Sequence, residues 1–331
     1  MWRFEKRKEE QMRYIEVTKF GGPEVLKVLE APTPKVMDDS ILIEVKASGV
    51  NYADVTARQG FYPMIPSAPF RPGFEVVGVV VATGSKVSGF SNGDLVGAIL
   101  LEGGGYATHA LIPAASAIKF PQNFDPAVAA GLLVQGLTAY LVLDEAGLKA
   151  GETVLIAGVS GGVGSLASQI AKLKGARVIG LASESKHKFA RERGADAVFD
   201  YGKTGWGKAV LEATGGQGAD IFLDPQAELS GDAVTALAQK ARWFIYGARA
   251  DNGASKASEI IWPMIGKNIS IRGYSVESSF HNVPRALGDL FKWVAEGSLK
   301  IDITTFPLTD VVNAHEQFST RKTTGKIVLK P

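Results

Sequence analysis

The sequence predicts an α/β protein in which a mostly β N-terminal part is joined to a doubly wound parallel sheet. Residues 12–125 are rich in β-branched residues and are interrupted by Gly, Pro, Asn and Asp. From residue 126 onward, segments with strand and helix character alternate as far as residue 274. The length of 331 residues suits two domains of ordinary size.

The N-terminal part contains five β-rich segments bounded by turn-forming residues, at 14–20, 25–32, 41–50, 74–84 and 94–100. Residues 125–147 are then apolar at helical spacing, and Asp125 stands as an N-cap before Pro126 at the first helical position. This helix is expected to begin the second domain.

The second part predicts six parallel strands, at 152–159, 177–182, 197–201, 219–225, 241–247 and 268–274. Helical segments are expected between them, at 163–174, 185–193, 206–213 and 230–240. A helix at 283–296 and short strands near 306–308 and 326–331 are too small to bury a core, so they should complete the N-terminal domain. The expected division is a flexible arm at 1–11, one domain from 12–126 with 275–331, and the other from 127–274.

Composition excludes several functions. A formal net charge of +2 gives no sign of nucleic-acid binding or of attachment to a membrane surface, and no apolar run long enough to span a bilayer was expected. The absence of cysteine removes disulfides, thiolate metal sites and a cysteine nucleophile. With no secretory signal core near the N-terminus, a cytoplasmic location is expected.

Residues 158–164 read GVSGGVG and lie between a predicted strand and a predicted helix. Glycines allow the chain to turn tightly and approach an anion, while the N–H groups at the start of the helix face it. A structural turn would be the alternative for this motif alone, but five further strands follow in order. The loop is therefore expected to bind a dinucleotide pyrophosphate through the N–H groups of Gly161, Gly162 and Val163.

The chain resembles the quinone oxidoreductase (zeta-crystallin-like) branch of the medium-chain dehydrogenase/reductase superfamily. Six segments carry the resemblance, at 47–63, 71–80, 103–114, 133–140, 151–165 and 323–331. Gly158 departs from the alanine usual in that branch, and ARQGFYP (57–63) and ASESKH (182–187) resemble its vesicle amine transport protein subgroup. The resemblance implies a Rossmann NADP-binding domain, a GroES-like catalytic domain and a cofactor cleft between them.

NADPH is the expected cofactor. The second strand of the parallel sheet ends in Ala182, without the acidic residue that binds the ribose hydroxyl of NAD. By resemblance, Lys186 and Tyr201 hold the adenosine 2′-phosphate, and Ser183 could donate to the same group. The resemblance also implies that Thr138 lies near the nicotinamide and Lys326 near the cofactor cleft, although Lys326 could instead be an ordinary lysine at a strand end. From the fold, Gly247 is expected on the nicotinamide side at the mouth of the sheet.

The chemistry is expected to be independent of zinc. Asn51 and Phe74 stand where the zinc-dependent alcohol dehydrogenases have Cys and His, so hydride should pass to an acceptor that is already activated, a quinone or an enone. The resemblance implies that Asn51 and Tyr62 are the candidate catalytic donors, and that Asn51 could instead hold the nicotinamide ribose. Glu75 is expected to be a structural carboxylate, and Arg58 a surface or ion-pair residue, with catalytic roles as the alternatives.

Two further expectations concern partners. Residues 268–275 should form an edge strand able to pair with a second copy in a homodimer. Residues 61–71 are apolar and rich in proline, which indicates a small hydrophobic acceptor but does not separate a quinone from an enone. An NADPH-binding protein with little turnover, in a structural or vesicle-associated role, remains the alternative function.

Overall fold

The computed structural model describes residues 10–227, 229–248 and 257–331, so most of the expected N-terminal arm lies outside the described residues. The chain divides into two compact units. The β-rich unit contains residues 1–133 and 303–331, and the parallel-sheet unit contains residues 134–302.

The expected boundaries differ from this division at residues 127–133, which lie in the β-rich unit, and at residues 275–302, which we expect in the N-terminal domain. Residues 275–302 belong to the parallel-sheet unit because α9 (Val283–Ala295) packs on α3 (Leu137–Glu145). The rings of Tyr140 and Trp293 lie 5.9 Å apart, and the Tyr140 hydroxyl donates to Asp289 at 2.5 Å. Through these contacts α9 packs into the core of the parallel-sheet unit.

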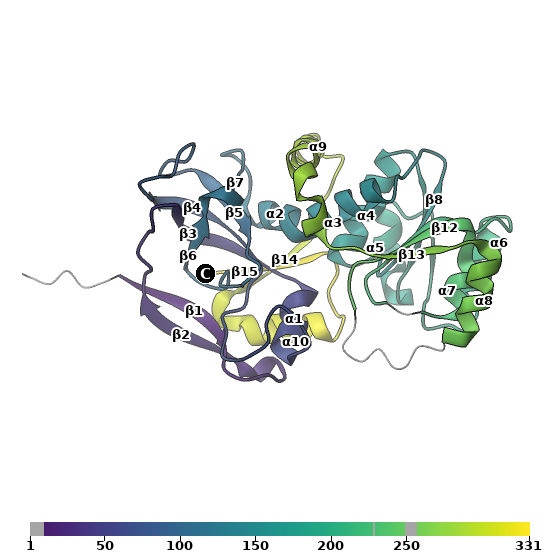
Figure 1. Cartoon of the computed structure of the whole chain (residues 1–331), viewed down its shortest axis with the longest axis horizontal. Helices are drawn as coiled ribbons and strands as arrows, with labels where there is room; N and C mark the ends of the chain where they lie inside the picture. Colours follow the sequence, from purple (N-terminus) through teal and green to yellow (C-terminus); the bar gives the residue numbers. More distant parts are fainter. Residues whose placement is uncertain (1–9, 228, 249–256) are drawn as a thin grey trace, which may run out of the picture. The chain divides into compact units, whose positions relative to one another are not determined.

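The β-rich unit contains a two-stranded sheet and a seven-stranded sheet (Figure 1). The small sheet pairs β1 (Gln11–Val17) with β2 (Leu26–Pro32). The large sheet follows the order β14 (Ile303–Pro307), β15 (Lys326–Lys330), β3 (Ser40–Val50), β4 (Glu75–Thr83), β5 (Leu95–Ile99) and β7 (Ile118–Lys119), and β6 (His109–Pro113) also pairs with β3. Helices α1 (Tyr52–Gln59), α2 (Pro126–Gly131) and α10 (Val311–Ser319) belong to the same unit.

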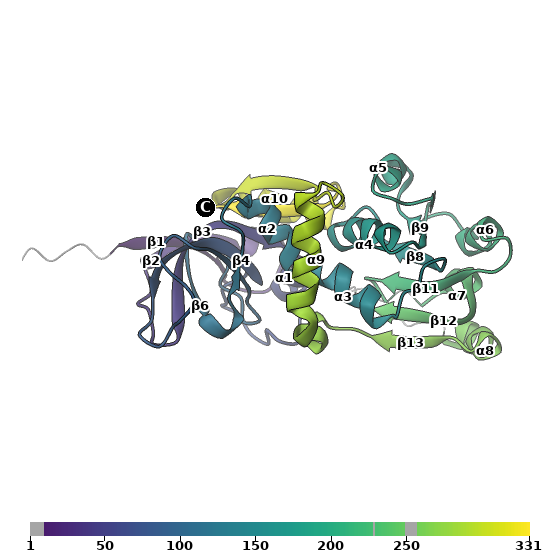
Figure 2. The same cartoon turned by 90° about the horizontal axis from the view of Figure 1, so that it is seen from above.

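The parallel-sheet unit contains the six parallel strands that the sequence predicts. Their order is β10 (Ala197–Phe199), β9 (Arg177–Leu181), β8 (Thr153–Ala157), β11 (Ala219–Asp224), β12 (Leu237–Ile245) and β13 (Ser270–Gly273). In Figure 2, α3 and α4 (Gly162–Leu173) lie on one face of the sheet, and α6 (Trp206–Ala213), α7 (Gly231–Ala236) and α8 (Ala257–Lys267) lie on the other. After β9 come a 3-10 turn at Glu184–Lys186 and the short helix α5 (His187–Glu192). The arrangement is a doubly wound Rossmann sheet.

Local chemistry explains where these elements begin. The Asp125 carboxylate accepts from the backbone N–H of Ala127 at 2.7 Å, which confirms the predicted N-cap of α2. The helix expected at 230–240 ends earlier, at Ala236, because the chain from Leu237 joins the sheet as β12. The sequence did not predict α1, α8 or α10.

The long helical segment Pro126–Glu145 corrects one expectation, since we predicted no apolar run of membrane-spanning length. Its 20 residues have a mean hydropathy of 1.7 in the most apolar window, which is long and apolar enough to cross a bilayer. Within that window, 83% of the residues are buried inside the protein. The segment is a core helix, and it contains a π-helical stretch at Leu132–Gly136.

Candidate functional site

The glycine-rich loop links β8 to α4 at the carboxyl end of the central strand. Gly158 has φ +62°, a left-handed conformation that an alanine would adopt only with strain. Its carbonyl accepts from the N–H of Gly161, which is the N-cap of α4. Gly162 and Val163 are the first two residues of that helix, so the expected pyrophosphate-binding residues all lie at its N-terminus.

Two further glycines of this loop are required by packing. A Cβ on Gly162 would lie 2.6 Å from Nε2 of Gln135, so the glutamine side chain lies directly against the loop. A Cβ on Gly164 would lie 2.8 Å from Cα of Val159, which explains the close approach of α4 to the strand end. Gln135 was not predicted from the sequence.

The residues expected at the 2′-phosphate follow two neighbouring strands. Ser183 and Lys186 come after β9, and Tyr201 comes after β10. The strands are parallel and paired, and the N–H of Ala182 donates to the carbonyl of Phe199 at 3.0 Å where they end. Ser183, Lys186 and Tyr201 therefore lie on adjoining loops at one edge of the sheet.

The acidic residue that follows β9, Glu184, has another partner. Glu184 forms an ion pair with Lys203 at 3.4 Å, and both side chains are mostly exposed. The Nε2 atom of His187 lies 3.0 Å from the carbonyl oxygen of Ala182, which ties the short helix to the strand end.

Of the residues expected near the nicotinamide, Thr138 and Gly247 belong to the parallel-sheet unit. Thr138 is 8% exposed on α3. Gly247 follows β12, and a Cβ there would lie 2.5 Å from the carbonyl oxygen of Pro225, so this glycine lets the loops after β11 and β12 come together.

A buried trio of Asn51, Glu75 and Lys326 forms the polar centre of the β-rich unit. The Asn51 amide donates to Glu75 Oε1 at 2.8 Å, and the Lys326 ammonium donates to Asn51 Oδ1 at 2.8 Å. Lys326 and Glu75 also form a direct ion pair. All three side chains are at most 4% exposed. Such a pair is stable only when hydrogen bonds satisfy both charges, as they do here.

Sheet topology explains why these residues meet. Strand β3 lies between β4 and β15 and is antiparallel to both, so its end meets the starts of its two neighbours. Asn51 follows the end of β3, Glu75 begins β4 and Lys326 begins β15. Gly49 leaves room for them, because a Cβ there would overlap Glu75 and lie 2.5 Å from Cε of Lys326.

The structure bears on three expectations in this unit. Lys326 donates to Asn51 and forms an ion pair with Glu75, and its place near the cofactor stays a prediction. Glu75 makes the structural hydrogen bonds that we expected. Arg58 is not a surface residue: it is 1% exposed, and its guanidinium donates to the carbonyl of Gly21 at 2.6 Å. Arg58 belongs to a run of five buried residues at 54–58 on α1.

The other candidate donor, Tyr62, lies three residues after the end of α1. It is half-buried, and its ring packs against that of Phe74 at 5.2 Å. Phe61 and Met64 on either side are 60% and 47% exposed, so the apolar loop predicted at 61–71 does present apolar side chains at the surface of its unit.

The side chains present do not fit a zinc ion. Zinc sites use Cys, His, Asp and Glu ligands, and the chain has no cysteine. Within residues 10–227, 229–248 and 257–331, no three His, Asp or Glu side chains are grouped so as to hold a metal. Phe74 is buried and packs in an apolar cluster with Ala57 and Ile65.

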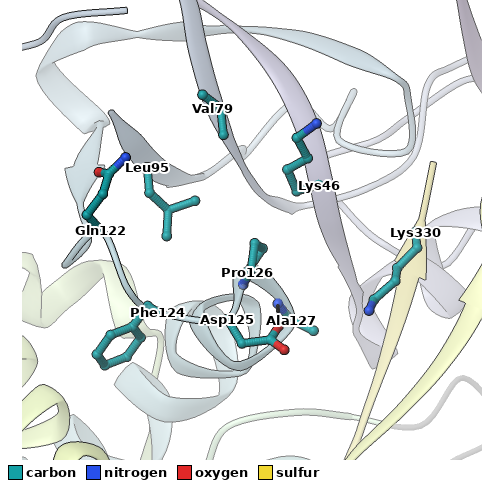
Figure 3. Close-up of a pocket in the computed structure, with 9 residues that line it drawn as sticks. All are labelled: Lys46, Val79, Leu95, Gln122, Phe124, Asp125, Pro126, Ala127 and Lys330. Atoms are coloured by element: carbon teal, nitrogen blue, oxygen red, sulfur yellow. Dashed lines mark hydrogen bonds between the residues drawn. The ribbon is translucent and has the colours of Figure 1, made fainter. Parts of the chain in front are cut away.

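A surface pocket of about 450 Å³ in the β-rich unit contains none of the predicted site residues (Figure 3). It is lined by Lys46, Val79, Leu95, Gln122, Phe124, Asp125, Pro126, Ala127 and Lys330. The only carboxylate among these residues, Asp125, caps α2. We assign this pocket no catalytic role.

Sequence reasoning missed Asp54, which is fully buried beneath Asn51. Its carboxylate accepts from the N–H of Asn51 at 2.8 Å and from the N–H of Gly73 at 2.9 Å. Burial raises the pKa of Asp54 to about 7, against the lowering effect of these two hydrogen bonds. The spacing Asn-x-x-Asp is a capping-box pattern and could have identified both Asp54 and the start of α1.

Comparisons with known proteins agree with this geometry. Residues 37–122 match the alcohol dehydrogenase GroES-like domain, and residues 162–293 match the family described as zinc-binding dehydrogenase. The chain is 35% identical to the quinone oxidoreductase of Sus scrofa over 96% of its length and 97% of that protein. It is 30% identical to the synaptic vesicle membrane protein VAT-1 homolog of Rattus norvegicus, over 97% of this chain and 84% of the relative.

A solved structure extends the similarity to the fold. The structure is similar to that of the Escherichia coli quinone oxidoreductase complexed with NADPH, with a TM-score of 0.90 and 29% identity. The match covers 96% of this chain and all of the other.

Proposed function

The chain belongs to the quinone oxidoreductase branch of the medium-chain dehydrogenase/reductase superfamily, and we propose that it is a zinc-independent reductase that uses NADPH to reduce a quinone or an α,β-unsaturated carbonyl compound. The observation that carries the proposal is the buried trio. Its lysine, carboxylate and amide occupy the polar centre of the β-rich unit, and no three His, Asp or Glu side chains are grouped around a metal position in the part of the chain that the structure describes.

The parallel-sheet unit would hold the cofactor. Gly161, Gly162 and Val163 present the helix N-terminus to the pyrophosphate. Lys186 supplies a positive charge for the 2′-phosphate, and Tyr201 supplies a hydroxyl donor. When bound, NADPH supplies a hydride from its nicotinamide ring.

In this proposal the acceptor is activated by its own conjugation, because among the described residues no three His, Asp or Glu side chains are grouped to hold a metal that could polarise a simple ketone. A quinone or enone meets this condition, and the negative charge then develops on its oxygen. In our proposal, the Asn51 amide and the Tyr62 hydroxyl donate to that oxygen. The amide has one orientation, since its oxygen accepts from Lys326 and its nitrogen donates to Glu75.

The test is to follow NADPH oxidation by protein treated with a chelator. The panel contains 1,4-benzoquinone, 9,10-phenanthrenequinone, an alkyl enone, and a secondary alcohol with NADP⁺. We expect turnover of a quinone or an enone and none of the alcohol. If NADPH binds and nothing is reduced, the alternative of an NADPH-binding protein with little turnover replaces the proposal. Oxidation of the alcohol alone would contradict the proposal that the reaction is independent of zinc.

We also propose that the protein is a cytoplasmic homodimer formed along β13. This strand is at the edge of the parallel sheet. The neighbouring helix α8 exposes Ile261, Trp262 and Ile265, and Trp262 is 76% exposed. Strand pairing between two copies would extend the sheet and place this apolar patch close to the contact. Sedimentation should give the dimer mass for the wild type, and a monomer would contradict the proposal.

A further inference from the structure

One buried carboxylate joins two of the three chain segments that supply the buried trio. Asp54 Oδ2 accepts from the N–H of Asn51, and Asp54 Oδ1 accepts from the N–H of Gly73. The first segment carries the Asn51 amide, and the second runs directly into Glu75 at the start of β4. A single side chain therefore connects the positions of two members of the trio.

The connection is rigid because the surrounding groups are tightly packed. Gly73 has φ +103°, and a Cβ there would lie 2.6 Å from Cδ1 of Tyr106. Tyr106 is 1% exposed, and its hydroxyl lies 3.4 Å from Nε2 of the buried His315. The segment before Glu75 thus lies between Asp54 and an aromatic ring, with little room to move.

We propose that Asp54 is a positioning residue for the reductase reaction. By holding the backbone at Asn51 and Gly73, it sets the place of the Asn51 amide relative to Glu75. The inference rests on the proposed function, since the Asn51 amide is the donor in that reaction. Asp54 itself donates nothing to the acceptor.

Hydrogen-bonding capacity sets the order of the expected effects. Aspartate offers two acceptor oxygens to the two N–H groups, asparagine offers one, and alanine offers none. A misplacement of about 1 Å in a catalytic group can lower the rate by about 10²-fold. Asp54→Ala should therefore lower kcat by about 10²-fold, and Asp54→Asn by about tenfold.

The test compares these two variants with Asp94→Asn as a control. Asp94 is in the same unit and also accepts a backbone N–H, from Ser91 at 2.8 Å, but it lies outside the trio. We expect the KM for NADPH to stay within about twofold of wild type in all three variants, because the residues expected to bind the pyrophosphate and the 2′-phosphate are in the other unit. The control should keep the wild-type kcat.

Amide hydrogen exchange provides a readout that does not depend on turnover. In Asp54→Ala, the N–H groups of Asn51 and Gly73 should exchange faster, while the amides of β3 at 41–45 remain protected. If the wild type reduces no acceptor, the proposed function fails. Hydrogen exchange still tests whether Asp54 holds the backbone at Asn51 and Gly73. Asp54→Asn provides the test if Asp54→Ala does not fold.

Several results would overturn the inference. Asp54 has no positioning role if Asp54→Asn and Asp54→Ala both keep kcat within about twofold of wild type. The same conclusion follows if the Asn51 and Gly73 amides of Asp54→Ala exchange at wild-type rates. Loss of protection throughout β3 in both variants would show that Asp54 stabilises the fold in general.

Discussion

The buried ion pair between Glu75 and Lys326 should affect the free energy of unfolding when either partner is replaced. Glu75→Gln removes the carboxylate and leaves the Lys326 ammonium buried with Asn51 Oδ1 as its partner. Lys326→Met leaves the Glu75 carboxylate with the Asn51 amide. Removing one member of a buried pair typically costs about 3–5 kcal/mol, because a charge remains without compensation.

The double variant separates this effect from loss of packing. Both side chains are then neutral and of similar size to the originals, so the cost of an uncompensated charge disappears. We expect each single variant to lose about 3 kcal/mol of unfolding free energy. The loss in the double variant should be smaller than the sum of the two single losses by about 2 kcal/mol or more.

Urea unfolding followed by far-UV circular dichroism is the appropriate assay. Tryptophan fluorescence would mostly report on the other unit, which contains Trp206, Trp243, Trp262 and Trp293. The reasoning is refuted if the double variant loses as much stability as the two single variants together.

Three other predictions follow from single side chains. Gly49→Ala should destabilise the protein by about 1–3 kcal/mol, since its Cβ overlaps the buried trio, whereas Gly288→Ala, with open space around its Cβ on α9, should be neutral or stabilising by urea midpoint. Burial lowers the pKa of His315 from 6.5 to about 3 in the folded protein. Below pH 6.5 the unfolded state therefore binds a proton that the folded state does not, and the protein loses stability as the pH falls. His315→Gln should therefore gain stability relative to wild type by up to about 1.4 kcal/mol per pH unit between pH 6 and 4, and a constant difference in unfolding free energy would contradict this. Lys186→Ala should raise the KM for NADPH about tenfold or more in steady-state kinetics and leave that for NADH unchanged; equal effects on both would remove Lys186 from the 2′-phosphate site.

The parallel-sheet unit could be predicted well because its signals are local. Each strand is a short apolar run, and the glycines at 158–164 stand between a strand and a helix. The six parallel strands and the cap at Asp125 followed from these patterns. Gln135 was missed because its packing against Gly162 depends on how α3 and its preceding turn lie against the loop.

The buried trio was only partly predictable. Asn51 and Lys326 were both singled out, but 275 positions separate them, and only the pairing of β15 with β3 brings them together. The burial of Arg58 and His315 likewise depends on α1 and α10, two helices that the sequence pattern did not reveal. The sequence does not indicate that a single charged residue is buried unless the helix or strand that contains it is known.

The central claim is that hydride passes to a conjugated acceptor without a metal. The most direct measurement supplies chelator-treated protein with an alkyl enone and NADPH carrying deuterium at the transferred C4 position, and locates the label in the product by mass spectrometry and NMR. The account predicts deuterium on the β-carbon and a saturated ketone as product. Deuterium on the carbonyl carbon, with an alcohol as product, or turnover only after zinc is added, would contradict it.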